Sequence, residues 1–253
     1  MAPSAVSAAE VQRRLREAGS PERARGAARY FKTGPGEYGE GDVFVGASVP
    51  AQRAIARACR GLARTELDLL LRSPVHEERL TALLVLCEQH AHGDAAARAS
   101  LSRYYLSRLR RVNNWDLVDV SAPTLLGEQL VAGDHALLDE LAASRDVWSR
   151  RVAMVATFAR TRRGDATAAL HVATRLLYDE HDLIQKAVGW MLREVGKRAG
   201  IDALEAFLEQ HAATMPRTAL RYAIERFPKA ERDAWLARRA QARLLAPGRE
   251  GYR

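Results

Sequence analysis

The sequence predicts an all-helical (all-α) protein, built as an α-solenoid of stacked antiparallel helix pairs. Apolar residues recur at helical spacing along the whole 253-residue chain. The alternating apolar and polar stretches that are typical of strands are nearly absent. Four helix-sized segments also align at a constant step of 36 residues. A repeat of this length made of helix pairs is the pattern of a solenoid, whose concave face usually binds the partner.

Two short helices are predicted at the N-terminus. Ser7 and Glu10 form a capping-box pattern, which begins a helix over residues 8–18. Ser20-Pro21 ends this helix and begins a second one, which ends near Phe31.

Residues 33–49 form the only long irregular stretch of the sequence. It contains Gly34-Pro35-Gly36-Glu37-Tyr38-Gly39, which has the glycine spacing of a dinucleotide-binding loop. No strand precedes these residues, and Pro and Glu lie among them, so we do not expect a nucleotide cofactor here. A shaped loop near the binding face is the better interpretation.

From Pro50 onward, helices follow one another with short breaks and no flexible linker. The breaks are predicted at Ser73-Pro74, Gly93-Asp94, Gly133-Asp134, Gly164-Asp165, Arg198-Ala199-Gly200 and Phe227-Pro228. We therefore expect one domain over residues 1–253: N-terminal helices and the Gly-rich loop (1–49), repeats (50–240) and a basic tail (241–253).

One of the four aligned segments carries a carboxylate where the others carry an apolar residue. The segments cover residues 77–83, 113–119, 149–155 and 185–191, and their seventh positions are Leu83, Asp119, Val155 and Met191. A fifth, weaker copy covers residues 219–224. Burying a carboxylate is costly unless its charge is needed. Asp119 is therefore the first candidate for a functional residue.

A helical wheel predicts which residues share a face with Asp119. With about 100° per residue, the core stripe of the last segment is Ile184, Val188, Met191, Leu192 and Val195. The same register places four side chains in one sector about 100° wide beside the core stripes: Trp115, Asp119, Arg151 and Trp190. Arg150, Lys186 and Arg193 lie farther round and form a basic flank.

Trp115 and Asp119 are neighbours on one helix face, because they are four residues apart. A tryptophan in a helical protein is usually a core residue, and a helical aspartate is usually a cap or a solvated side chain. Together they favour a site for a cation, which aromatic faces attract and a carboxylate stabilises. Arg151 is most simply a phosphate clamp, although a surface ion pair is the common alternative.

The composition favours an acidic partner. The net charge is +8 and the isoelectric point is about 9.9, with Arg far more frequent than Lys, which suits phosphate recognition. A G+C-rich genome would also enrich Arg. Two cysteines and no long apolar run favour a reducing cytoplasm, and we expect no membrane association. His90 and His92 are too few for a metal site, so no metal is expected.

The segment Asn113-Asn114-Trp115-Asp116-Leu117-Val118-Asp119 resembles the AlkD-type DNA alkylation repair glycosylases, which have HEAT-like repeats. The resemblance extends from about Tyr30 to Arg226, and its other strong parts are Trp148-Ser149-Arg150-Arg151 and residues 184–194. It implies a HEAT-like solenoid with a concave basic face and a cytoplasmic, bacterial, nucleoid-associated monomer. It also implies a partner: duplex DNA that carries alkylated bases.

The resemblance implies a task for each candidate. Asp119 is expected to be the catalytic carboxylate, and Trp115 and Trp190 the aromatic walls around the damaged nucleotide. Arg151 is expected near the lesion and its phosphates, and Tyr30 near the same cleft. The implied activity is excision of cationic 3-alkyl and 7-alkyl purines from duplex DNA without base flipping. A damaged-DNA-binding protein without catalysis and a protein-binding scaffold are the alternatives. The longer, more acidic loop at residues 34–42 departs from the family pattern and bears on lesion choice.

Overall fold

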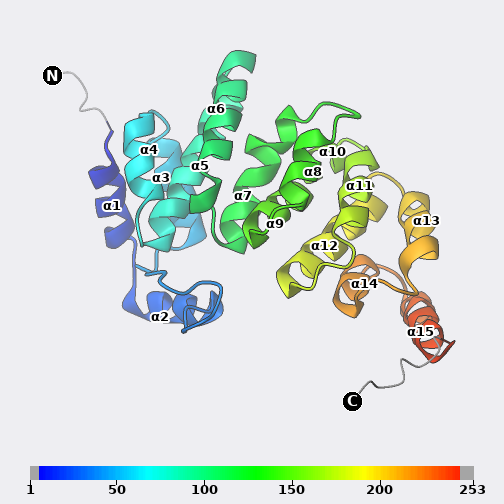
Figure 1. The fold of residues 1–253 in the computed structure, drawn as a ribbon. Coiled ribbons are helices and arrows are strands. Elements are labelled where there is room, and N and C mark those ends of the chain that lie inside the picture. The colour runs from blue at the N-terminus through cyan, green and yellow to red at the C-terminus, as the bar shows by residue number, and fades with distance from the viewer. Residues whose placement is uncertain (1–5, 246–253) are drawn as a thin grey trace. The chain divides into compact units, whose positions relative to one another are not determined.

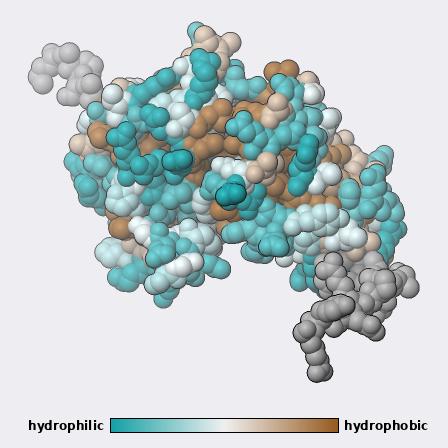
Figure 2. Space-filling view, viewed as in Figure 1, coloured by the Kyte–Doolittle hydropathy of each residue, from teal (hydrophilic) through white to brown (hydrophobic). Residues whose placement is uncertain are grey.

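The computed structural model describes residues 6–245 and confirms the all-helical prediction (Figure 1). Across this range, helices and turns account for the fold, and the only extended pairing is an isolated bridge between Val43 and Val75. Hydrophilic residues cover most of the visible face, with groups of hydrophobic residues showing among them (Figure 2). Of the predicted basic tail, residues 241–245 belong to the last helix, and residues 246–253 lie outside the described residues.

The chain forms two compact units, Met1–Gln129 and Leu130–Arg253, and each is described by itself. The single-domain organisation therefore stays a prediction. The helices of the first unit are α1 (Ala8–Glu17), α2 (Pro21–Tyr30), α3 (Val49–Ala58), α4 (Arg64–Leu71), α5 (His76–His92), α6 (Ala95–Ser107), the 3-10 helix η1 (Leu109–Arg111), α7 (Trp115–Leu125) and the 3-10 helix η2 (Gly127–Gln129).

The second unit continues the alternation of helices and short turns. Its helices are α8 (Ala136–Ala142), α9 (Val147–Ala156), α10 (Phe158–Thr161), α11 (Thr167–Arg175), α12 (Asp182–Arg198), α13 (Ile201–His211), α14 (Arg217–Ala223) and α15 (Lys229–Leu245). The predicted breaks fall between helices, except that Arg198 of the break at residues 198–200 is the last residue of α12. Further breaks, such as those at residues 143–146 and 176–181, were not predicted.

Side-chain caps begin the two N-terminal helices as predicted. The Ser7 hydroxyl accepts a hydrogen bond from the Glu10 amide at 3.3 Å. The Ser20 hydroxyl accepts one from the Arg23 amide at 3.5 Å, directly before the proline that begins α2. Such caps satisfy amides that have no partner inside the helix. The Glu10 carboxylate binds Arg13 and Arg14.

The four aligned segments fall in α5, α7, α9 and α12, which carry the repeat within each unit. In the first unit α5 packs on α3 and α7, and in the second α12 packs on α9 and α14. The apolar seventh positions are buried, and so is the whole predicted core stripe of α12. One glycine makes close packing possible: a Cβ atom at Gly189 would lie 2.4 Å from the Ala219 carbonyl oxygen, so α14 approaches α12 where no larger residue fits.

Candidate active site

The first turn of α7 places Trp115 and Asp119 one turn apart. Asn114 is fully buried, and its side-chain oxygen accepts a hydrogen bond from the Trp115 amide at 2.8 Å. This cap sets the start of the helix at Trp115, two residues later than the aligned segment begins. Asp119 lies within the helix and is half-buried, as the helical wheel predicts for the rim of the core.

Two aromatic rings contact Trp115 on the side of α2 and the loop that follows it, and a third ring stacks behind one of them. The Tyr30 ring, which is 66 % exposed, meets Trp115 edge-on, with 5.7 Å between ring centroids. Phe31 stacks on Trp115 at 5.2 Å, and Phe44 stacks on Phe31 at 5.3 Å. The structure thus brings Tyr30 and Trp115 together, and it adds two phenylalanines that the sequence interpretation missed.

A buried ionic network lies behind this aromatic stack. The Nδ1 atom of His76 is 2.9 Å from the Asp42 carboxylate, and its Nε2 atom is 2.7 Å from the Asp116 carboxylate. Arg79 donates a hydrogen bond to the other oxygen of Asp42 at 2.6 Å. The side chains of Asp42, His76 and Arg79 are each at most 6 % exposed. The network therefore joins the loop, α5 and α7 inside the first unit.

Hydrogen bonds and charges in this network shift the pKa values of His76 and Asp42. Burial disfavours the charged imidazole, but hydrogen bonds to Asp116 and Asp42 outweigh it and raise the pKa of His76 to about 9. Burial also opposes ionisation of Asp42, yet the hydrogen bond from His76 and the charge of Arg79 hold its pKa below the ordinary value. His76 and Asp42 are consequently both charged at neutral pH.

The Gly-rich loop has a defined shape, as the sequence predicts. The buried carboxylate of Glu77 accepts hydrogen bonds from the Gly46 amide at 2.7 Å and the Val45 amide at 3.1 Å. Gly46 has a positive φ of 79°, and a Cβ atom there would lie 2.2 Å from the Ser20 carbonyl oxygen. These contacts attach the loop to α5 and to the start of α2, and Phe44 of the loop stacks on Phe31, which stacks on Trp115.

In the second unit, Trp190 and Arg151 lie on the packed helices α12 and α9. Trp190 is half-buried, and its ring centroid is 6.0 Å from that of Phe158. Arg151 is only 5 % exposed, and its guanidinium donates a hydrogen bond to the Leu183 carbonyl oxygen at 2.6 Å. Arg151 thus also holds the first turn of α12, and its predicted phosphate contact stays a prediction.

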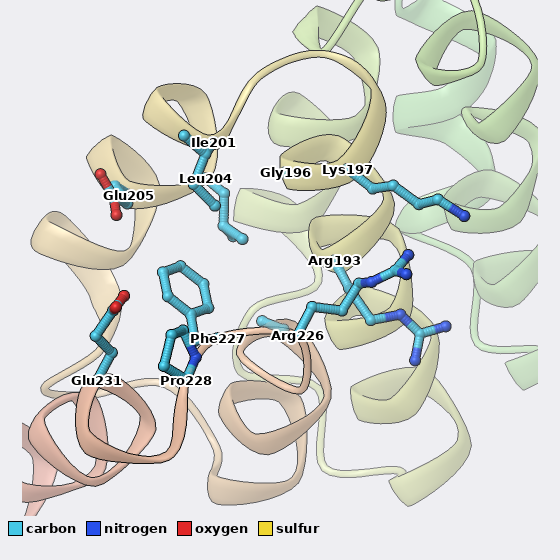
Figure 3. A pocket seen from close by; sticks show the side chains of 11 residues that line it. Arg193, Gly196, Lys197, Ile201, Leu204, Glu205, Arg226, Phe227, Pro228 and Glu231 are labelled. Carbon is cyan, nitrogen blue, oxygen red and sulfur yellow. The ribbon is translucent and has the colours of Figure 1, made fainter.

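The residues of the predicted basic flank all form ion pairs. Arg150 binds Asp179 at 2.6 Å, Lys186 binds Asp182 at 2.6 Å, and Arg193 binds Glu225. Arg193 also lines a pocket of about 270 Å³ near α13 and the start of α15. In Figure 3 the charged ends of Arg193, Lys197 and Arg226 point to the same side, away from the Phe227 ring. In the second unit the three flank residues are therefore paired with carboxylates, and Arg193 lines the pocket together with Lys197 and Arg226.

The predicted sector of four side chains includes residues of both units. Trp115 and Asp119 belong to the first unit, and Arg151 and Trp190 to the second. Their shared surface stays a prediction. Of the missed residues, Phe31 and Phe44 carried a weak signal, because aromatic residues flank the loop. Asp42, His76 and Asp116 carried none, since acidic residues in a loop and at a helix start are common on solvated surfaces.

A comparison with protein families gives one match over most of the chain. Residues 11–227 match the model of a family described as DNA alkylation repair enzyme. The chain belongs to this DNA alkylation repair enzyme family. The loop, the aromatic stack, Asp119 and Trp190 all lie within the matched residues, so the family assignment covers the candidate residues of both units.

A solved structure, the predicted DNA alkylation repair enzyme from Enterococcus faecalis, shares the fold. The TM-score is 0.62 at 18 % sequence identity, with 83 % of this chain and 97 % of that chain covered. No curated protein matches this member of the family. Among the described residues of the present chain, no helix is both long enough and apolar enough to cross a membrane. The family assignment supports a role in DNA alkylation repair.

Proposed function

We propose that this protein is a DNA N-glycosylase that excises cationic 3-alkyl and 7-alkyl purines from duplex DNA. The observation that carries the proposal is the half-buried Asp119 one turn from Trp115, whose ring contacts Tyr30 and Phe31. Aromatic faces attract cations, and a carboxylate stabilises positive charge that develops in a transition state. This combination suits a substrate that becomes an oxocarbenium ion.

The proposed reaction needs few protein groups, because the damaged base is already a good leaving group. In a 7-alkylguanine the bond between C1′ and N9 breaks, and its electron pair neutralises the positive charge of the ring. The sugar becomes an oxocarbenium ion, which the Asp119 carboxylate stabilises. Water then bonds to C1′ and gives a proton to Asp119, which passes it to solvent. The products are the free base and an abasic site.

The remaining candidates are proposed to bind the DNA. Trp190 is the second aromatic wall, as the resemblance implies. Arg151, Arg150, Lys186 and Arg193 contact phosphates, and Tyr30 contacts the same DNA from α2. The positive net charge supports electrostatic attraction to the duplex. The base stays in the helix rather than in a pocket, so the usual extrusion of the target nucleotide is not required.

Release of 7-methylguanine and 3-methyladenine from methylated duplex DNA tests the proposal. We expect release by the wild-type protein, and a rate at least about 100-fold lower for Asp119→Asn, which keeps the shape and removes the charge. Asp94→Asn is the matched control: Asp94 is an exposed helix cap in the same unit, and asparagine caps equally well.

No release of base by the wild-type protein, or equal release by Asp119→Asn, would overturn the catalytic proposal. Tight binding to damaged DNA without release would favour a non-catalytic DNA-binding protein.

A further inference from the structure

The buried network of Asp42, His76 and Asp116 takes no part in the proposed reaction, although it lies next to the site. Its three members come from the loop, from α5 and from α7. Each ring nitrogen of His76 lies within hydrogen-bond distance of a carboxylate. When both carboxylates are ionised they can only accept hydrogen bonds, and each ring nitrogen then has to carry a proton. The carboxylate contacts at both ring nitrogens therefore fit an imidazolium ion.

This imidazolium ion reaches Trp115 by two routes. Asp116, which binds Nε2, is the residue that directly follows Trp115 in the first turn of α7. The His76 ring also packs against Phe31 at 4.7 Å and against Phe44 at 4.9 Å. Phe31 in turn stacks on the Trp115 ring at 5.2 Å. Both the backbone and the ring of Trp115 are thus connected to His76.

We propose that protonated His76 is a positioning residue that holds the first turn of α7 and the plane of Trp115 in place for the alkylated nucleotide. The proposal rests on the proposed glycosylase function. A neutral imidazole has only one N–H donor, so its loss of a proton leaves the carboxylate oxygen of Asp42 or of Asp116 facing an unprotonated ring nitrogen, without the donor it had. The carboxylate then has to move or take up a proton, and Trp115 moves with α7 or with the loop.

The charges around His76 balance when it is protonated. The loop contributes Asp42, α7 contributes Asp116, and α5 contributes Arg79, which binds Asp42 on its other oxygen. The neighbouring Glu77 on α5 binds the amides of the loop, and Glu78 accepts a hydrogen bond from Gln12 on α1. Two carboxylates therefore face one imidazolium and one guanidinium.

Nitrogen-15 NMR of the His76 ring tests the charge. We expect both ring nitrogens to stay protonated through pH 8 and to titrate near pH 9, because burial is outweighed by the two carboxylates that raise the pKa of His76. His171 serves as an internal comparison, since its Nε2 atom lies 2.7 Å from a single, partly exposed carboxylate, that of Asp139. Titration of His76 near 6.5, with one unprotonated nitrogen at pH 8, would overturn the proposal.

Single-turnover release of the alkylated base tests the positioning. His76→Gln is expected to lower the rate constant about tenfold, while the dissociation constant for damaged DNA stays within about twofold, because displacement of catalytic groups affects the chemical step most. His171→Gln is the matched control and is expected to keep the wild-type rate. A wild-type rate constant for His76→Gln would contradict a positioning role.

Asp42→Asn separates geometry from charge. The amide can donate to a neutral His76 and still accept from Arg79, so every contact of the network survives without the imidazolium. We expect the release rate to stay within about threefold of wild type, while the pKa of His76 falls towards its ordinary value. A loss of rate as large as that of His76→Gln would show that contact geometry alone does not position Trp115.

The indole N–H signal of Trp115 keeps the proposal independent of catalysis. It is expected to shift in His76→Gln and to stay unchanged in His171→Gln. If the wild-type protein releases no base, the proposed function fails, whereas this signal still measures the positioning of Trp115. An unchanged Trp115 signal in folded His76→Gln would overturn the further inference whatever the activity.

Discussion

The two units hold their candidate tryptophans by different means. In the first unit, Trp115 stacks on Phe31, which packs against the buried His76 ring, and His76 lies between the carboxylates of Asp42 and Asp116. In the second, Trp190 lies on α12, which is held by close packing against α14 at Gly189 and by the Arg151 contact to the Leu183 carbonyl. The first arrangement depends on ionisation and the second mainly on shape.

This difference has a physical consequence. A buried ion pair gives little net stability when complete, but the loss of one partner leaves a charge that water cannot reach. Close packing has no such dependence on protonation, and it fails only when volume is added or removed. The first unit should therefore respond to pH and to charge removal, and the second to changes in side-chain size.

Removal of one buried charge is expected to have the largest effect on stability. Arg79→Met leaves the buried Asp42 with one cationic partner, and we expect a loss of about 3–5 kcal/mol in the free energy of unfolding. Arg150→Met in the second unit is the matched change, because the Arg150 side chain is 18 % exposed and its partner Asp179 is 9 % exposed. Water can reach this pair, so the expected loss is smaller, about 1 kcal/mol. Urea unfolding measures both, and equal losses would contradict the contrast between the units.

The pH dependence of stability is the next largest effect. Since the pKa of His76 rises on folding from about 6.5 to about 9, its contribution is complete below pH 6.5 and is lost as pH rises towards 9. The total is about 3 kcal/mol over this window. Unfolding at a series of pH values measures the slope, which His76→Gln should abolish. A wild-type stability that is constant from pH 6.5 to 9 would show that His76 does not carry the charge.

The repeat helices and the position of Asp119 could be predicted from the sequence because they depend on local spacing. Periodic apolar residues place α5, α7, α9 and α12, and the register of a single helix places Asp119 at the rim of the core. The aligned segment begins at residue 113, whereas α7 begins at Trp115, where the Asn114 side chain caps it. Features that depend on residues close together in the sequence could thus be predicted.

The buried network could not be predicted, because its members come together only in the folded chain. His76 is 34 residues from Asp42 and 40 residues from Asp116. Nothing in the spacing of such residues separates an ionic network from solvated charges. Arg151 illustrates the same limit: the wheel placed it beside the core, but only tertiary packing shows that its side chain reaches the Leu183 carbonyl.

Added volume at the contact between α12 and α14 is expected to have a moderate effect. The Cβ atom of Gly189→Ala would meet the Ala219 carbonyl oxygen at 2.4 Å and the Tyr222 Cβ atom at 2.5 Å, so we expect a loss of about 1–3 kcal/mol. Gly26→Ala is the control, because Gly26 lies in a helix with no atom within 4 Å of the added Cβ. Alanine favours helix there by up to about 1 kcal/mol. Similar values for the two variants would show that α14 can move away from α12 at no cost.

Removal of an exposed cation is expected to have the smallest effect on stability, and it distinguishes a DNA-binding residue from a structural one. Lys186 and Lys229 each bind an aspartate four residues along a helix, at 2.6 Å in both cases. Because such exposed pairs contribute little, Lys186→Ala and Lys229→Ala should each change the free energy of unfolding by less than about 0.5 kcal/mol.

If Lys186 contacts a phosphate, Lys186→Ala should also reduce the salt dependence of DNA binding by about one released counterion, and Lys229→Ala should not. An equal salt dependence of DNA binding for the two variants would show that Lys186 does not contact a phosphate in the proposed interface.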